Sequence, residues 1–323
     1  MVSGLLLHYV GLSDMLFVCC NKMMFVPRKS NCMKLFRSSS PAWPPTWTFD
    51  AGVYIWRVLF SNAGEILGEA RDPEKKETWF FCLEEATGTL LWRDLRHPEA
   101  WWTGIEAIEG GRFFLHGFRK PDMPQHLGIR AHDLHSGTLL WSSEEYTFLL
   151  AQGDDVYASR EKFSGLEFYR LSAVDGGVTE ELGQDTSRIN DLRQQQNEED
   201  FFRGYRYPDP LSDAHPHADA ARSALDGIVD PAQVAGNLDV LVEAPLLFAA
   251  WHIAEERPEN GRPSLKQEFL ALNTDSGKTL FRGPILTGAD APGMDSFFIK
   301  DHQLIYIHER CAIHAHDLNG AAS

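Results

Sequence analysis

The chain has 323 residues, of which 43% are hydrophobic and 24% charged, and this composition excludes wholesale disorder. Its 46 acidic and 30 basic residues give a net charge of −16, which repels a phosphate backbone and argues against nucleic acid as a partner. No uncharged apolar run reaches the length of about 18 residues that a membrane-spanning helix needs, so the sequence predicts no membrane span.

The amino-terminal segment differs in character from the rest. Its first forty residues carry five basic residues and one acidic residue, and serine and proline follow. We therefore expect residues 1–45 to be a disordered leader, or an over-long start whose true beginning is Met33 rather than Met1, followed by a Pro-rich linker. Trp43, in this linker, is expected to tolerate replacement by alanine.

Three of the five cysteines (Cys19, Cys20, Cys32) lie in this leader, which leaves Cys82 and Cys311 isolated in the body of the chain. Two lone cysteines do not form a disulfide framework for a chain of this size. The sequence therefore favours a cytoplasmic protein. Export, or a periplasmic location, is the alternative, although the leader lacks the charge order of a secretory signal.

An internal repeat gives the main result for the fold. Residues 87–92 read Thr-Gly-Thr-Leu-Leu-Trp, and residues 136–141 repeat the pattern as Ser-Gly-Thr-Leu-Leu-Trp. Weaker copies surround Gly176, Gly277 and Gly320. Extended runs with period-two alternation flank each glycine, which indicates hairpins, and a period of about 40 residues is typical of β-propeller blades.

The repeats predict an all-β fold, a β-propeller of about five four-stranded blades, with six or seven possible. The predicted blades are Gly52–Leu95, Trp101–Ser142, Thr147–Gly183, Leu238–Gly283 and Ser296 to the end. The last blade is one strand short, and residues 46–49, which carry Trp47, are expected to complete it beside Tyr306 and His314. Unrelated hairpins of a β-sandwich are the alternative.

Residues 184–236 break the repeat with a polar, acidic stretch. We expect a short polar helix that contains Ile189, Leu192 and Gln196, a second helix over residues 218–225, and a helix start at Asp230 before Pro231. The segment is either a decorating insertion or a degenerate sixth blade. Residues 46–323 are thus expected to form a single domain with an insertion at 184–236.

The repeat residues resemble those of a known superfamily. Ala131, Asp133, Gly137 and Trp141 stand at the spacing of the tryptophan-docking repeat of the quinoprotein-like (PQQ-repeat) β-propellers. Two further partial copies are Ala271, Asn273, Gly277 and Phe281, and Cys82, Glu84, Gly88 and Trp92. The resemblance covers residues 46–183 and 237–323, and is strongest to a bacterial branch of unknown function.

The resemblance implies the fold but not the cofactor. Quinoprotein dehydrogenases use adjacent cysteines over the quinone, a calcium ion and a catalytic aspartate, whereas the only adjacent pair here, Cys19 and Cys20, lies outside the repeats. We therefore predict no cofactor and do not favour quinone-dependent oxidation. Non-enzymatic members of the superfamily serve as scaffolds or ligand-sensing domains, and the resemblance implies a role of this kind for this chain.

Histidines gather near the carboxyl end, where His308, Cys311, His314, His316 and Asp317 lie within ten residues of one another. His314 and His316 would share one face of a strand but lack the paired spacing of a zinc ribbon or an HExxH helix. His215 and His217 read as a solvated loop pair. We therefore predict no metal site.

A binding pocket is expected on the second blade. Four aromatic and imidazole side chains of one blade and its long hairpin loop could combine there: Trp101, Trp102, His116 and His126. Adjacent strand residues face opposite ways, so only one of the two tryptophans can line the pocket, and packing between blades is the competing interpretation. No GxSxG, P-loop or GxGxxG motif is present.

These observations favour a non-catalytic binding or scaffold module that recognises an unidentified protein or small molecule. The alternative is an enzyme of unknown reaction with its site at the central channel of the propeller. No catalytic residue is predicted.

Overall fold

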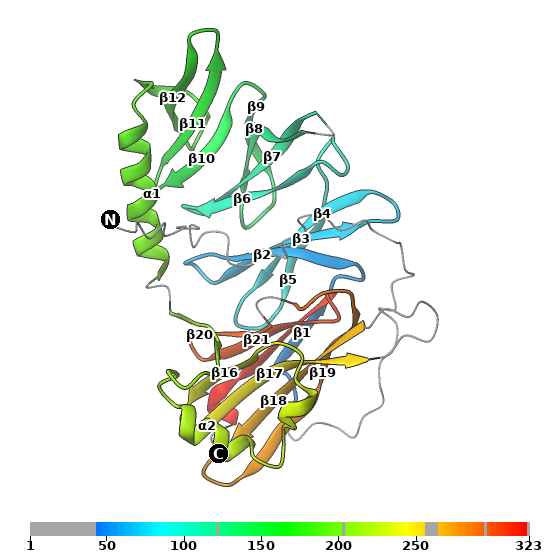
Figure 1. The fold of residues 1–323 in the computed structure, drawn as a ribbon. Coiled ribbons are helices and arrows are strands. Elements are labelled where there is room, and N and C mark those ends of the chain that lie inside the picture. The colour runs from blue at the N-terminus through cyan, green and yellow to red at the C-terminus, as the bar shows by residue number, and fades with distance from the viewer. Residues whose placement is uncertain (1–42, 121–122, 202–203, 256–263, 294–295, 322–323) are drawn as a thin grey trace, which may run out of the picture. The chain divides into compact units, whose positions relative to one another are not determined.

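The computed structural model describes residues 43–120, 123–201, 204–255, 264–293 and 296–321 (Figure 1). These residues form two compact units. Unit 1 contains Arg57–Arg71 and Lys75–Arg203, and unit 2 contains Asp72–Glu74, Gly204–Ser323 and the described residues 43–56. Residues 1–42 of the predicted leader, with Cys19, Cys20 and the possible starts Met1 and Met33, lie outside the described residues. The prediction of a single domain stays a prediction.

The strands form five antiparallel sheets within the described residues. The first has the order β2 (Tyr54–Phe60), β3 (Glu65–Asp72), β4 (Glu77–Glu84), β5 (Leu90–Leu95). The second has the order β6 (Thr103–Glu109), β7 (Arg112–Lys120), β8 (Met123–Asp133), β9 (Leu139–Ser143). The third has the order β10 (Thr147–Gln152), β11 (Asp155–Lys162), β12 (Gly165–Ser172), β13 (Val178–Gly183).

The other two sheets belong to unit 2. The fourth has the order β15 (Asp209–Pro210), β16 (Leu238–Glu243), β17 (Leu246–Glu255), β18 (Ser264–Asn273), β19 (Lys278–Ala289). The fifth has the order β1 (Trp47–Asp50), β22 (Ala312–Asp317), β21 (Gln303–His308), β20 (Phe298–Lys300), β14 (Tyr205–Arg206). Each sheet contains the predicted consecutive hairpins, and the all-β fold of β-propeller class is confirmed.

The amino-terminal strand lies in the last sheet, as predicted. Trp47 is opposite Ala315, and Thr48 is opposite His314. The backbone N–H of Asp317 also donates to the Thr46 hydroxyl at 2.9 Å. Strand β1 therefore pairs along one edge of β22, which would otherwise expose unpaired backbone groups.

The repeated tryptophans dock on the turn of the following sheet within unit 1. The indole Nε1 of Trp141 donates to the backbone carbonyl of Ala173 at 2.9 Å. Gly176, three residues later, has a φ of +74°, and a Cβ on it would lie 2.6 Å from the Trp141 ring. The glycine thus supplies both the left-handed turn and the space for the indole.

The insertion contains the expected helices. Helix α1 (Thr186–Phe201) places Ile189 against the third sheet, and α2 (Ala218–Leu225) has the predicted bounds. The carboxylate of Asp230 accepts from the N–H of Ala232 at the start of a short 3₁₀ helix, Pro231–Gln233. The insertion also contributes β14 and β15, two strands that the sequence did not indicate.

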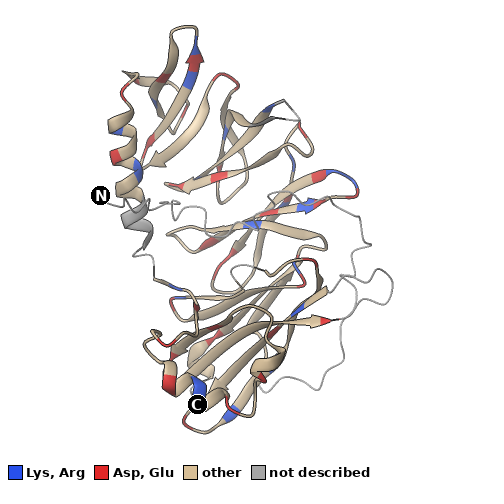
Figure 2. Ribbon diagram, in the orientation of Figure 1, with Lys and Arg blue, Asp and Glu red and all other residues tan. Residues whose placement is uncertain are grey.

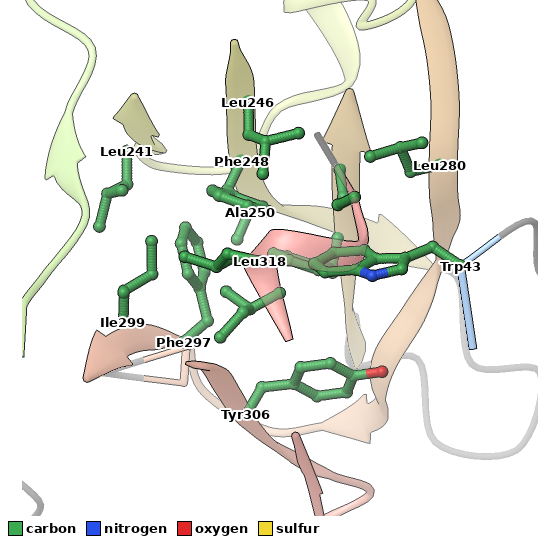
Figure 3. Packing of buried hydrophobic residues seen from close by; sticks show 14 of the residues in the cluster. Trp43, Leu241, Leu246, Phe248, Ala250, Leu280, Phe297, Ile299, Tyr306 and Leu318 are labelled. Carbon is green, nitrogen blue, oxygen red and sulfur yellow. The ribbon is translucent and has the colours of Figure 1, made fainter. Parts of the chain in front are cut away.

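Trp43 belongs to the core of unit 2, contrary to the prediction that it lies in an exposed linker. It is 6% exposed, and its ring centroid lies 6.2 Å from that of Phe248 and 4.5 Å from that of His316. Figure 3 shows the indole lying across the cluster beside Leu280 and Tyr306. The neighbouring prolines indicated a linker, and for this reason the sequence did not reveal that Trp43 is buried in the core.

Acidic and basic residues both occur along the strands of the third sheet (Figure 2). Arg170 on β12 contacts Asp155 at 3.5 Å and Glu180 at 3.0 Å, and Lys162 pairs with Glu167. Such solvent-screened pairs add little to stability. Neither of the two α-helices in the described part of the chain combines the length and apolar character needed to cross a membrane.

Candidate functional site

Three chemically active side chains converge on one face of the second sheet in unit 1. The Nδ1 atom of His126, on β8, lies 2.8 Å from Oε1 of Glu106, on β6. The Nδ1 atom of His116, on β7, lies 3.1 Å from the same oxygen. The two imidazole rings are stacked, with centroids 3.6 Å apart and an interplanar angle of 9°. We refer to these three residues as the Glu106–His116–His126 cluster.

Two irregularities in strand pairing create this convergence. On β6, Ile105 is opposite Leu115 and Ala107 is opposite Phe114, so Glu106 is the extra residue of a β-bulge. A second shift in the β7–β8 pairing falls at His116. Bulges re-aim side chains and are frequent beside functional sites. Here they bring residues from three strands to one point.

Aromatic rings border the cluster. Phe118 follows His116 by two residues, so it shares the same strand face, and it is opposite His126 across the β7–β8 pair. Its ring contacts both imidazoles edge-on, with centroids 5.1 Å from each. Trp102 packs edge-on against Phe118 at 5.7 Å and extends this aromatic border.

Trp101 lies apart from the cluster. Its ring receives the guanidinium of Arg71 at 5.2 Å and the ammonium of Lys76 at 5.9 Å. Of the four residues predicted to form a pocket, the structure therefore brings together His116, His126 and, through Phe118, Trp102. Trp101 and Trp102 lie in a bend just before β6 and not on a strand, so strand alternation does not account for the different surroundings of their rings.

Buried polar side chains of neighbouring strands support His116. Glu69, which is fully buried, accepts from the N–H of Ile105 at 3.0 Å and pairs with Arg71 at 2.6 Å. The Thr103 hydroxyl donates to the backbone carbonyl of His116 at 2.8 Å. At Gly104, a Cβ would lie 2.9 Å from Cε1 of His116 and 3.2 Å from Oε2 of Glu69. The absent side chain allows the ring and the carboxylate to approach each other.

The site combines an ionised carboxylate with a neutral imidazole. Burial raises the pKa of Glu106, but the contacts with His116 and His126 outweigh it and hold the pKa at about 2. Burial lowers the pKa of His116, and the neighbouring Glu106 only partly opposes this effect. Nδ1 of His116 is buried and has no hydrogen-bond partner, because the 3.1 Å approach to Glu106 lies outside hydrogen-bond geometry.

This cluster is the one group of three metal-type side chains in the described part of the chain whose ligand atoms lie within 4.8 Å of one another. Two imidazole nitrogens and a carboxylate oxygen form a set that can bind a transition metal, an acidic hydrogen-bond donor or a small polar ligand. The side chain of His126 is 38% exposed, so a ligand can reach the cluster from solvent on this side.

The histidines near the carboxyl end have a different role. His314 and His316 share one strand face, and both pack on Tyr306, with centroids 5.2 and 5.7 Å from it. They join no three-ligand group among the residues the structure describes. His215 and His217 lie before α2, where Nδ1 of His215 accepts from the N–H of His217 at 3.1 Å.

Sequence reasoning missed Glu106 and Phe118. Phe118 follows from His116 by period-two alternation, so this signal was present. Glu106 had no comparable signal, because regular alternation along β6 does not reveal where a bulge falls.

A known protein family matches part of the chain. Residues 61–141 match a family described as a domain of unknown function (DUF4905). The matched segment contains the whole Glu106–His116–His126 cluster. No curated protein matches the chain.

Three solved structures illustrate the likeness in fold. The β-propeller domain of the Trilobed protease from Pyrococcus furiosus is 10% identical with a TM-score of 0.29, and the match covers 82% of this chain and 65% of that one. The Dos1 propeller is 8% identical with a TM-score of 0.28, covering 82% of this chain and 68% of that one. An endo-arabinase from Bacteroides thetaiotaomicron is 9% identical with a TM-score of 0.25, covering 86% and 96% respectively.

Proposed function

We propose that the chain is a non-catalytic binding module and that it holds a small ligand at the Glu106–His116–His126 cluster. The observation that carries this proposal is the convergence of three polar side chains, from three strands, on one point that solvent can reach past His126. A packing role alone does not require a buried carboxylate and two imidazoles at a strand bulge, since burying such groups costs free energy.

The chemistry of the neighbouring groups supports binding rather than covalent catalysis. The cluster itself contains no hydroxyl or thiol nucleophile. Cys82, on the adjacent sheet, is fully buried, and burial raises its pKa to about 12, so its thiol stays protonated at neutral pH. A binding module needs only the groups that the cluster already provides.

A scaffold role that uses no ligand remains distinguishable from this proposal. The ligand-binding version predicts that a small molecule or ion stabilises the folded chain and that the effect depends on His126. A scaffold predicts neither. The resemblance to non-enzymatic quinoprotein-like propellers supports both versions equally.

The test is a thermal-shift screen on the full chain, first treated with a chelator, against divalent metals, sugars, small carboxylates and quinones. A ligand at a hundred times its Kd is expected to add about 2.7 kcal/mol to the free energy of unfolding. The shift should disappear in His126→Ala and persist in His135→Ala, which replaces an exposed histidine in the turn between β8 and β9. A shift retained in His126→Ala, or no shift with any compound, would contradict the proposal.

A further inference from the structure

We propose that the Glu106–His116–His126 cluster is a binding site for a zinc-class transition metal ion, with Nδ1 of His116, Nδ1 of His126 and a carboxylate oxygen of Glu106 as its ligands. The proposal rests on the proposed binding function and gives its ligand a chemical class. It departs from the sequence-based prediction of no metal site, which considered only the histidines near the carboxyl end and in the loop at 215–217.

The spacing of the three ligand atoms fits one ion. Two ligands held about 2.1 Å from a tetrahedral zinc ion lie about 3.4 Å apart. In the structure, Oε1 of Glu106 lies 3.1 Å from Nδ1 of His116 and 2.8 Å from Nδ1 of His126. A small outward movement of one ring therefore brings all three atoms to coordination distance.

His126 is the ring that can make this movement. Its side chain is 38% exposed, whereas those of His116 and Glu106 are 7% and 14% exposed. The two rings lie in nearly parallel planes with centroids 3.6 Å apart, so the His126 ring must move outward for both nitrogens and the carboxylate oxygen to surround one ion. The exposed side of His126 is also where a fourth ligand, a water or a small molecule, would enter.

The buried His116 directs a nitrogen toward the carboxylate of Glu106. Its Nδ1 is buried and lies 3.1 Å from Oε1 of Glu106, but this approach does not meet the geometry of a hydrogen bond. A metal ion at the cluster would give this nitrogen a well-directed partner.

The surroundings of His116 match the outer shell of a metal-binding histidine. Such a ring usually faces a carboxylate or carbonyl with its second nitrogen, which fixes its orientation. Glu69 lies on that side: the Cβ that Gly104 lacks would be 3.2 Å from Oε2 of Glu69 and 3.2 Å from Nε2 of His116. Hydroxyls anchor both histidine backbones, because Thr103 donates to the carbonyl of His116 at 2.8 Å and Thr147 to that of His126 at 3.0 Å.

The donor set selects the class of metal. Two imidazoles and one carboxylate suit zinc, cobalt and nickel, whereas calcium and magnesium prefer sites made of oxygen ligands alone. Phe118 and Trp102 border the cluster with apolar rings, which limits the access of water and strengthens the interaction between ion and ligands.

Metal titration of the full chain tests the site. Chelator-treated protein is titrated with Zn²⁺ by calorimetry and with Co²⁺ by visible absorption, whose ligand-field bands report a tetrahedral site with nitrogen ligands. We expect one ion per chain. His126→Ala and Glu106→Gln should each weaken the affinity more than about tenfold, while His135→Ala and His314→Ala should leave it unchanged. Melting temperatures without metal confirm that each variant is folded.

Two outcomes would overturn the metal site: no tetrahedral Co²⁺ spectrum, or a Zn²⁺ affinity that both His126→Ala and Glu106→Gln retain. The proposed binding function fails separately. If a small molecule binds in the presence of chelator and requires His126, the binding module stands and the metal site falls. If zinc-loaded protein hydrolyses an ester, peptide or phosphoester and Glu106→Gln abolishes turnover, the metal site stands and the non-catalytic function falls.

Discussion

The indole Nε1 of Trp92 donates a hydrogen bond of 2.8 Å to the backbone carbonyl of Leu134, which lies 42 residues further along the chain in the next sheet. Trp141 makes the equivalent bond to Ala173. The repeated tryptophan therefore joins one sheet of unit 1 to the turn of the next, and the glycine of that turn lies under the indole.

Gly176→Ala should destabilise the chain far more than Gly153→Ala. Both glycines have positive φ, +74° and +59°, but a Cβ at Gly153 meets nothing within 4 Å, whereas one at Gly176 would lie 2.6 Å from the Trp141 ring. We expect a loss of about 1 kcal/mol for Gly153→Ala from backbone strain. Gly176→Ala should lose about 3 kcal/mol, because it also displaces the indole and its hydrogen bond. Urea unfolding measures both, and equal losses would contradict the docking role.

Trp43→Ala and Trp47→Ala should both destabilise unit 2, by about 3–5 kcal/mol each. Both side chains are buried, Trp43 against Phe248 and His316 and Trp47 on the strand that pairs with β22. Phe163→Ala, which replaces a fully exposed aromatic side chain, should change stability little. The measurement is chemical unfolding followed by tryptophan fluorescence and circular dichroism. A neutral Trp43→Ala would show that its buried position contributes nothing to the core.

Stability should fall as the pH drops from about 6.5 towards 4, because of His314 and His316. Burial, with a smaller contribution from neighbouring histidines, lowers the pKa of each from 6.5 to about 4. The unfolded chain therefore binds protons first, so the stabilisation is complete above pH 6.5 and is lost as the pH falls through this window. His316, which is 1% exposed, should account for about 3 kcal/mol.

Melting curves at a series of pH values measure this effect. His316→Phe preserves the aromatic packing against Trp43 and Tyr306 but removes the titrating group. It should flatten the pH dependence between 6.5 and 4. The pH dependence that remains in this variant comes from His314 and from His308, whose pKa is also lowered by burial. An unchanged slope in His316→Phe would show that His316 does not titrate in this range.

Gly104→Ala should weaken metal binding without altering a ligand. The new Cβ would lie 2.9 Å from Cε1 of His116, so the ring must shift from its present position beside Glu106. We expect at least a tenfold loss of Zn²⁺ affinity. Gly111→Ala, in the turn between β6 and β7, strains the backbone at a φ of +72° but meets no atom within 4 Å, so it controls for stability. Equal affinities in the two variants would contradict the supporting role of Gly104.

The blades could be predicted because the repeated motif and the strand periodicity of the sequence indicate the same structure. The Thr-Gly-Thr-Leu-Leu-Trp repeat marks a turn and a docking tryptophan, and period-two alternation marks the strands on either side. Even the missing strand of the last sheet followed from Gly320, since no extended run comes after it. Short stretches of sequence determine these turns, docking tryptophans and strands, so they can be recognised from the sequence alone.

The site could be predicted only in part, because two of its determinants are not local. His116, His126 and Trp102 were recognisable as chemically unusual residues of one predicted blade. Glu106 reaches them only through a bulge, and where a bulge falls depends on how two strands pair. Trp43 was missed for a related reason: prolines around it predicted exposure, and only tertiary packing shows that the indole is buried.

The pairing of β1 with β22 constrains how the last sheet can be completed during folding. The bond between Thr46 and Asp317 closes a loop of 271 residues, and closing so long a loop costs conformational entropy before any contact repays it. During synthesis β1 emerges first and has no pairing partner until β22 has been made. Until the two strands pair, one edge of β22 stays open. Partly synthesised or truncated chains therefore expose a strand edge that can pair with other chains and aggregate.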